Sequence, residues 1–314
     1  MWRATALSHD FYAKFWDSKC SDVKETEIDK SVNSVAAKAD LIGLFLAKNK
    51  NHGKEKLQEL IRTGKITEEL KNSIEKLSKL AINEPILEPS ELPEGSHTIK
   101  IRFTLRKPYA SHDDKGFYII DNPITKDRVF KIPLIRSSSW KGSLRWVSKH
   151  ALCKPELVVE RLFGNQKEKQ KAKQGRLFFY STFLNQVSLD VITPLKRDTR
   201  TPRRGPILFE TVPAGSCGTF SLLYFPFDLL PALRSQDKPA KEKAIEEMKG
   251  DLEVLKEAVP AMLLTYGFAA KKTSGYSVVK DGIDFCIDSD EVKKSNFDTY
   301  KNHIDRLIRT LVSG

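Results

Sequence analysis

Two groups of residues near the middle of the sequence have the chemistry of a functional site. The first is a single carboxylate, Asp121, which stands directly before an Asn-Pro pair. The second is "RSSSWKGSLRW", whose polar members include Ser137, Ser138, Ser139, Lys141 and Arg145. Serines at the start of a helix can cap it, and the unpaired N–H groups of that helix end attract anions. The pattern favours a phosphate-binding helix start, although a capped helix with solvated basic side chains has the same sequence.

Positive charge is concentrated in one part of the chain. The whole sequence carries a formal charge of +12, and the segment from Lys126 to Pro206 holds nineteen Lys and Arg against six Asp and Glu. An evenly basic surface would spread this charge, whereas a concentrated segment is typical of a face that binds a polyanion. Nucleic acid is the polyanion that we expect.

Two further stretches could contact the same polyanion. "KRDTRTPRR" contains five basic residues, which are Lys196, Arg197, Arg200, Arg203 and Arg204. "KKTSGY" contains Lys271, Lys272, Ser274 and Tyr276. These side chains could add phosphate contacts and one stacking ring. Without an RNA contact, the first stretch would be an ordinary charged hairpin tip and the second a plain turn.

The composition excludes several classes of protein. The sequence has no apolar run of the ~18 residues that a membrane span needs, and its start lacks the pattern of a signal peptide. Its four cysteines stand far apart without a CxxC pair, so we expect neither a disulfide framework nor structural zinc. The sequence therefore predicts a cytoplasmic protein without a membrane partner.

The periodicity of the chain predicts the elements that position these residues. Residues 1–95 have the pattern of a helical N-terminal extension that ends in a proline-rich linker. Ile99, Ile101 and Phe103 alternate with basic residues, which predicts a strand with one buried face and one wet, basic face. Helices are expected at about 139–151, in "PELVVERLFG" (155–164), at 240–259 and near the C-terminus. Strands are expected at 176–184, where aromatic residues suggest burial on both faces, and on either side of the basic loop.

This order of elements predicts an α+β fold. Residues 96–314 resemble a ferredoxin-like βαββαβ core, in which helices cover one face of an antiparallel sheet. Such a sheet with a basic open face is a common platform for single-stranded RNA.

Four stretches resemble the RAMP superfamily, the repeat-associated proteins that build CRISPR effector complexes. "KIPLIRSSSWKGSLRW" is similar to the "IPGSSLKGxLR" signature of that family. "RLFGN…GRLFFYS", the basic thumb hairpin "LKRDTRTPRRGPILFETVPAGSCGTFSLLY" and the glycine-containing loop "GFAAKKTSGYSVV" follow in the family's order. The resemblance covers residues 97–290. It departs from the family pattern at Trp140, where leucine is usual, and in the long helical extension.

The resemblance also implies a function for Asp121. "DNPITKDRVFKIP" looks like the Asp-x-Pro element of the repeated backbone subunits of type III complexes, where the aspartate cuts bound target RNA. One carboxylate cannot do this unaided, but it could hold a divalent cation, Mg²⁺, that stabilises the departing oxygen. Asp113, Asp114 and Asp127 could share that metal, and His112 could act as a base. Without the resemblance, an aspartate before Asn-Pro is more simply a turn former.

The partners that the resemblance implies are a guide RNA (crRNA), a target RNA and other subunits of the complex. Two alternatives stay open within the same superfamily. One is a structural or capping subunit that binds guide RNA without cutting target. The other is a guide-processing endoribonuclease, which is less favoured because His112 and His150 are the only histidines between Tyr109 and Asp290. We expect the first 95 residues to contact a neighbouring subunit.

Overall fold

A computed structural model describes most of the chain. It describes residues 28, 33–45, 49–80, 84–85, 87–112, 119–120, 122–165, 172–194, 196, 198–203 and 205–313. The chain divides into two compact units, each assembled from separate segments. The first unit is Met1–Lys76, Ser111–Pro133 and Asn185–Val212, and the second is Leu77–Ala110, Leu134–Leu184 and Pro213–Gly314. Both units combine segments from either side of residue 95, where the sequence predicts a domain boundary; that boundary stays a prediction.

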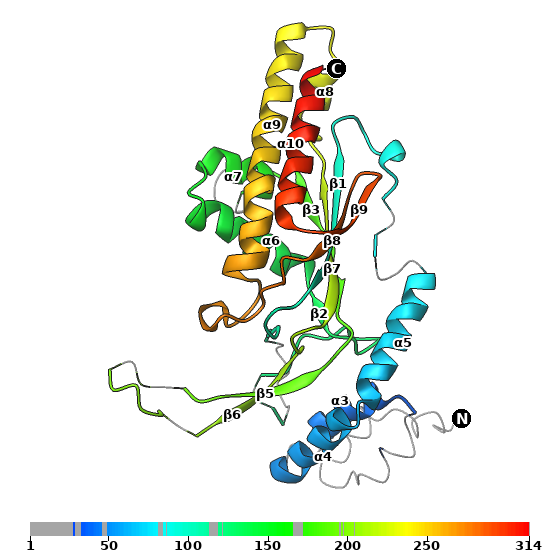
Figure 1. Cartoon of the computed structure of the whole chain (residues 1–314), viewed down its shortest axis with the longest axis vertical. Coiled ribbons are helices and arrows are strands. Elements are labelled where there is room, and N and C mark those ends of the chain that lie inside the picture. The colour runs from blue at the N-terminus through cyan, green and yellow to red at the C-terminus, as the bar shows by residue number, and fades with distance from the viewer. Residues whose placement is uncertain are drawn as a thin grey trace, which may run out of the picture. The chain divides into compact units, whose positions relative to one another are not determined.

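The second unit contains a five-stranded antiparallel sheet in the order β3-β7-β1-β8-β9 (Figure 1). Its strands are β1 (His97–Thr104), β3 (Leu177–Phe179), β7 (Cys217–Tyr224), β8 (Ile283–Ile287) and β9 (Asp290–Ser295). In β1, Ile99, Ile101 and Phe103 are buried while Arg102 is exposed, so the predicted alternation is confirmed. The predicted α+β class is also confirmed, because the chain combines helices with an antiparallel sheet.

The second unit also contains several helices. They are α6 (Ser137–Trp146), α7 (Glu156–Phe163), α8 (Leu230–Leu233), α9 (Lys238–Pro260) and α10 (Phe297–Ser313), with 3₁₀ turns η2 (Pro89–Glu91) and η5 (Lys272–Ser274). Two π-helical turns, η3 (Val147–Ala151) and η4 (Ala261–Tyr266), extend α6 and α9. Figure 1 shows α9 and α10 side by side, where Lys256 of α9 forms an ion pair of 2.8 Å with Asp305 of α10. The predicted apolar face of α9 is confirmed, because Met248, Leu252 and Leu255 are buried.

The first unit contains helices α3 (Val35–Phe45) and α4 (Lys50–Arg62), most of α5 (Lys65–Lys79), and a hairpin of β5 (Ser188–Ile192) and β6 (Ile207–Thr211). The two strands pair antiparallel from Ser188↔Thr211 to Ile192↔Ile207. The helical character expected for the N-terminal region and the strands expected around the basic loop are therefore both confirmed for the described residues. None of the described helices has the length and apolar character that crossing a membrane would require.

One predicted strand is confirmed only in part. Residues 176–184 form two short strands, β3 and β4 (Thr182–Phe183), and Phe178, Phe179 and Phe183 are only half-buried. The break occurs because the two halves pair with different partners: β3 pairs with β7, and β4 pairs with β2 (Leu134–Ile135). A run of aromatic residues thus predicts that a segment is at least partly buried, but it does not predict with which strand each residue pairs.

Candidate nucleic-acid interface

The start of α6 is fixed by the short β2–β4 pair. Arg136 follows β2 in an extended conformation, and the helix begins at Ser137, two residues before the expected start. The predicted capping role of the three serines is therefore wrong. Ser137, Ser138 and Ser139 occupy the first helical positions, the cap residue is Arg136, and no side chain caps the helix.

Core contacts anchor one side of this helix and leave the other side open. The Trp140 ring is fully buried, and its Nε1–H donates to Thr182 Oγ1 at 3.1 Å. The Ser137 N–H donates to Ser181 Oγ at 3.3 Å. Ser138 is exposed in the first turn, where the helix dipole places partial positive charge.

Two basic side chains continue the line of Ser137 along the helix. Lys141 and Arg145 follow it at intervals of four residues, so the three lie on one face of α6. Both basic residues are partly exposed. Gly142 lies beside them and is exposed, and no atom of the chain lies within 4 Å of the position that a Cβ would occupy there. The fold itself therefore does not require glycine at this position.

The loop from Gly267 to Ser277 lies against α6. The Ala269 N–H donates to Ser143 Oγ at 3.5 Å, and the Phe268 ring centroid lies 4.4 Å from that of Trp140. Gly267 has a φ of +70°, and a Cβ there would lie 2.7 Å from the Tyr276 carbonyl oxygen. This loop carries Lys271, Lys272, Ser274 and Tyr276, each at least partly exposed. The structure thus brings together two of the three groups of candidate RNA-binding residues that the sequence singled out.

The third group lies at the tip of the β5–β6 hairpin in the first unit. Lys196, Arg200 and Arg203 are exposed there. Hydrogen bonds from Lys196 N–H to Thr201 O (2.9 Å) and from Arg203 N–H to Pro194 O (2.8 Å) close the tip. Arg197 and Arg204, also predicted to contact nucleic acid, lie outside the described residues. The tip thus presents its described cations to solvent.

Part of the concentrated positive charge is used within the chain. Among the described residues, several of these basic side chains form ion pairs with acidic residues of their own unit, as Lys126, Lys131, Lys149, Lys154, Arg161 and Arg176 do. Arg176 is 2% exposed and its guanidinium bonds to Asp228, Asp251 and Glu247. The charge count therefore overstates the cations that can meet a polyanion, and the binding role stays a prediction for the exposed ones.

The open face of the five-stranded sheet is not basic. Lys100 and Arg102 line a depression of about 320 Å³ together with Glu84, Asp284 and Glu291. Strands β8 and β9 supply Asp284 and Glu291, and Glu84 precedes β1 in the chain, so the alternation of β1 alone could not reveal these acids. The expected basic platform on this face is therefore wrong.

Asp121 itself lies outside the described residues, but its neighbours in the chain are held within the first unit. On one side, the Ile119 N–H donates to the Gly43 carbonyl of α3 at 2.9 Å. On the other side, the Asn122 carbonyl accepts from the Glu210 N–H of β6 at 3.1 Å. Secondary-structure elements thus fix the path of the backbone immediately before and after the candidate residue.

Glu210 is a residue that the sequence analysis missed. Its side chain is fully buried, and its carboxylate accepts from the Ile124 N–H and from Lys126 Nζ, both at 3.0 Å. The available signal was a carboxylate inside the apolar strand "ILFETV", because a buried charge requires a partner. Buried Asp40 of α3 forms an ion pair of 3.0 Å with Lys131. This pair is a second attachment of the segment that follows Asp121.

The described residues do not by themselves form a metal site. Among them, no three carboxylate, histidine or cysteine side chains converge where they could hold an ion. Asp127, one of the expected ligands, accepts at Oδ1 from the N–H groups of Val129 (2.9 Å) and Phe130 (2.8 Å) and so closes a turn. Asp113 and Asp114 lie, like Asp121, outside the described residues. The Mg²⁺ site stays a prediction.

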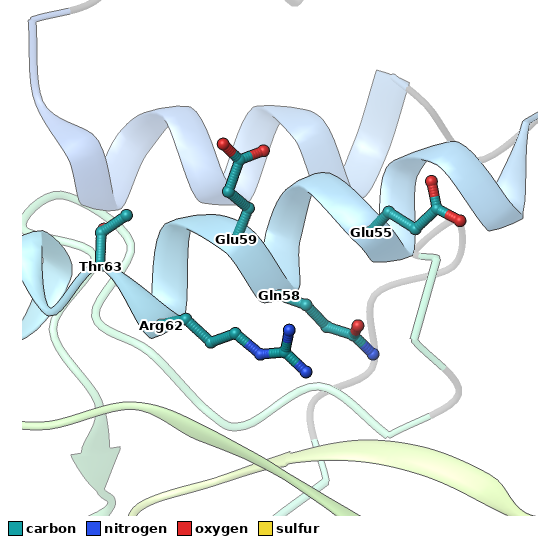
Figure 2. Close-up of a pocket in the computed structure, with 5 residues that line it drawn as sticks. All are labelled: Glu55, Gln58, Glu59, Arg62 and Thr63. Atoms are coloured by element: carbon teal, nitrogen blue, oxygen red, sulfur yellow. The ribbon is translucent and has the colours of Figure 1, made fainter.

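A second depression lies on α4 in the first unit. It has a volume of about 370 Å³ and is lined by Glu55, Gln58, Glu59, Arg62 and Thr63. Figure 2 shows Gln58 and Arg62 extending to one side of the helix and Glu59 to the other. All five residues belong to α4 and its C-terminal end, and Glu59 pairs with Lys56 at 3.2 Å. This depression is an ordinary polar helix face.

The sequence is similar to a known protein family and to a known protein. The family model of the RAMP superfamily matches residues 95–280. The CRISPR system Cms endoribonuclease Csm3 of Streptococcus thermophilus is 39% identical over 74 residues, which are 21% of this chain and 33% of that protein. The match therefore spans about a third of that relative's length.

Two solved structures contain chains with partial similarity to this chain, both with TM-scores below 0.5. One is a cryo-EM structure of the Type III-B Cmr-beta bound to cognate target RNA, with a TM-score of 0.46, 17% identity, and coverage of 90% of this chain and 89% of that chain. The other is a CRISPR RNA-guided surveillance complex, with a TM-score of 0.36, 15% identity, and coverage of 60% and 68%.

Proposed function

This chain belongs to the RAMP superfamily, and on that premise we propose that it is a backbone subunit of a type III CRISPR effector complex. The family match and the identity to a Csm3 protein over 74 residues support this assignment. In that role the chain binds a guide RNA, contacts neighbouring subunits and cuts a complementary target RNA.

The core of the second unit is ferredoxin-like in this proposal. Strand β1, helices α6 and α7, strands β3 and β7, helix α9 and strand β8 follow one another along the chain. The spatial order β3-β7-β1-β8 with antiparallel neighbours is the arrangement expected of a βαββαβ sheet. Strand β9 extends this sheet at one edge.

The observation that carries the guide-binding role is the continuous surface of α6 and the 267–277 loop. The first turn of α6 has no side-chain cap and carries the positive end of the helix dipole. Lys141 and Arg145 lie along the same helix face, and Lys271 and Lys272 lie on the adjoining loop. Exposed Gly142 leaves room for a sugar-phosphate backbone to approach the helix. These groups recognise phosphates and not bases, so guide binding would be independent of sequence.

Target cleavage is assigned to Asp121. Cleavage requires the ribose 2′-hydroxyl to be aligned with its neighbouring phosphate, and a well-oriented carboxylate contributes only if its backbone is fixed. The bonds of Ile119 and Asn122 support such an orientation. A Mg²⁺ ion held by Asp121 would stabilise the charge on the departing oxygen. Glu210 is buried and already paired, so its role is to hold the segment and not to touch RNA.

The experiment compares the assembled complex containing Asp121→Ala with the wild type, using labelled target RNA and Mg²⁺. We expect the variant to bind target as the wild type does and to lose cleavage at the position of this subunit. Glu242→Ala, a change at an exposed acid of α9, is the matched control and should cut normally. Unchanged products with Asp121→Ala would contradict the assignment.

One observation favours a second candidate, a structural or capping subunit that binds guide RNA without cutting. Asp127 Oδ1 accepts two hydrogen bonds within its own turn, which weakens this carboxylate as a ligand that could share a metal with Asp121. In this case Asp121→Ala would leave both assembly and the products unchanged.

A further inference from the structure

Two large aromatic side chains are exposed together in the second unit. Trp146, the last residue of α6, is 42% exposed, and Tyr266, the last residue of η4, is 38% exposed. Their ring centroids are 5.7 Å apart at an interplanar angle of 63°. Single exposed apolar residues are normal, but an aromatic pair at the surface indicates a binding site. The other tryptophan of this helix, Trp140, is fully buried, so the exposure of Trp146 is not a general property of α6.

Cationic and polar groups surround this pair. The Nζ of Lys272 lies 5.1 Å from the centroid of the Trp146 ring, a cation–π geometry. The ring centroid of His150 lies 5.8 Å from that of Trp146. Arg145 precedes Trp146 in the chain, so the pair adjoins the basic face of α6. A partner with negative charges and flat, polarisable rings would complement this combination.

The backbone at both aromatic residues is unusual. The π-helical turn η3 begins directly after Trp146, and η4 ends at Tyr266. Such turns are rare in proteins, and those that occur are often found at functional sites. In the neighbouring loop, Ala269, Lys271 and Ser277 have φ values of 66°, 55° and 62°, a region that residues with a Cβ adopt at a cost. The local backbone is thus held in costly conformations on the elements that present the aromatic pair and Lys272.

We infer that Trp146 and Tyr266 form a stacking site for a base of single-stranded RNA, with Lys272 beside it to pair with a phosphate. This inference rests on the proposed RNA-binding function and adds a contact to bases. Aromatic stacking accepts any base, because every base has a π face, so the site agrees with binding that is independent of sequence. An apolar protein partner would match the rings but not the cations around them.

The test compares two ligands of equal length on the full chain. One is a fluorescently labelled oligouridylate, and the other is the same ribose-phosphate oligomer without bases. Trp146→Ala should bind oligouridylate roughly 5- to 150-fold more weakly, the equivalent of the ~1–3 kcal/mol that stacking contributes per base. Its affinity for the abasic oligomer should stay that of the wild type. Trp146→Phe should retain most of the affinity for oligouridylate, which excludes loss of fold as the cause.

Leu157→Ala is the matched control, because Leu157 is a 72% exposed apolar residue on α7 of the same unit. This variant should bind both ligands as the wild type does. Equal affinity of Trp146→Ala and wild type for oligouridylate would overturn the stacking site and leave the phosphate-binding function standing. Failure of the wild type to bind either oligomer would instead overturn the RNA-binding function on which the stacking site rests. An equal loss of affinity for both oligomers in Trp146→Ala would also contradict stacking.

Discussion

Single residues carry the most direct information about where a ligand approaches. Gly142 lies inside a helix of ten residues, where glycine costs about 1 kcal/mol relative to alanine. No neighbour within the chain would clash with an alanine Cβ at this position. A residue that weakens the helix and relieves no contact within the described chain is best explained by an external group that comes close to the backbone.

Gly142→Ala should therefore raise stability and lower RNA affinity at the same time. The free energy of unfolding should increase by about 0.5–1 kcal/mol, because alanine favours the helix and costs less entropy on folding. Affinity for a short RNA should fall, because the added methyl group occupies the space of the sugar-phosphate backbone. Urea denaturation and RNA titration measure the two effects. Higher stability with unchanged RNA affinity would show that nothing approaches the helix here.

The elements of the second unit are held to one another by a buried polar network. The Arg176 guanidinium, directly before β3, bonds to Asp228 and to Asp251 of α9, and Arg161 of α7 bonds to the same Asp251 at 2.6 Å. The Tyr224 hydroxyl of β7 also donates to Asp251, at 3.0 Å. The two glycines of the "LFG…G" stretch allow this arrangement, since a Cβ on Gly175 would lie 2.4 Å from the Leu162 carbonyl oxygen. That stretch therefore has a role in the fold.

This network predicts how stability depends on acid. Burial alone would raise the pKa of Asp228, but the hydrogen bonds and charge of Arg176 outweigh it and lower that pKa. The stability that Asp228 contributes is therefore present above the ordinary carboxyl pKa of about 3.9 and is lost as pH falls through its lower folded value. Asp228→Asn should be less stable than the wild type at neutral pH, and the difference should shrink below about pH 4. Unfolding free energies of both proteins across this range are the measurement, and a constant difference would contradict the prediction.

The sequence predicted elements with strong local periodicity and missed features that depend on pairing. The strand at 97–104, the hairpin around the basic loop and helix α9 follow from patterns within each segment. The break between β3 and β4 and the acidic residues on the open sheet face depend on strands far away in the sequence. The exposure of Trp146 could be predicted in part from the sequence, because Trp146 lies six residues after buried Trp140 and so about 120° around the helix. The position of Tyr266 depends on a π-helical turn that no simple period predicts.

The whole molecule presents cations from both compact units, on α6 and its neighbouring loop in one and on the hairpin tip in the other. If both surfaces contact the same RNA, each contributes separately to the salt dependence of binding. Each phosphate contact to a single strand changes the slope of log K against log salt by about 0.7.

The pairs Lys141→Ala/Arg145→Ala and Arg200→Ala/Arg203→Ala should therefore each reduce that slope by about 1.4, and the four changes together by about twice as much. Titrations of the full chain with RNA at several salt concentrations measure the slopes. Lys238→Ala/Lys243→Ala, at exposed lysines of α9, should leave the slope unchanged. A wild-type slope in the hairpin variant would show that the tip does not meet RNA phosphates.

The interleaving of the two units affects how the protein can be dissected. The polypeptide passes between the units at residues 76–77, 110–111, 133–134, 184–185 and 212–213. Cutting the gene at residue 95 would remove the α3 partners of Ile119 and Lys131 along with any docking surface for another subunit. If a truncated protein failed to cleave, the loss could come from the missing supports of the Asp121 segment or from lost subunit docking, and the experiment would not separate the two. Charge-reversing changes at solvent-facing positions of α4, such as Glu55→Lys, would probe subunit docking while keeping the supports of the Asp121 segment in place.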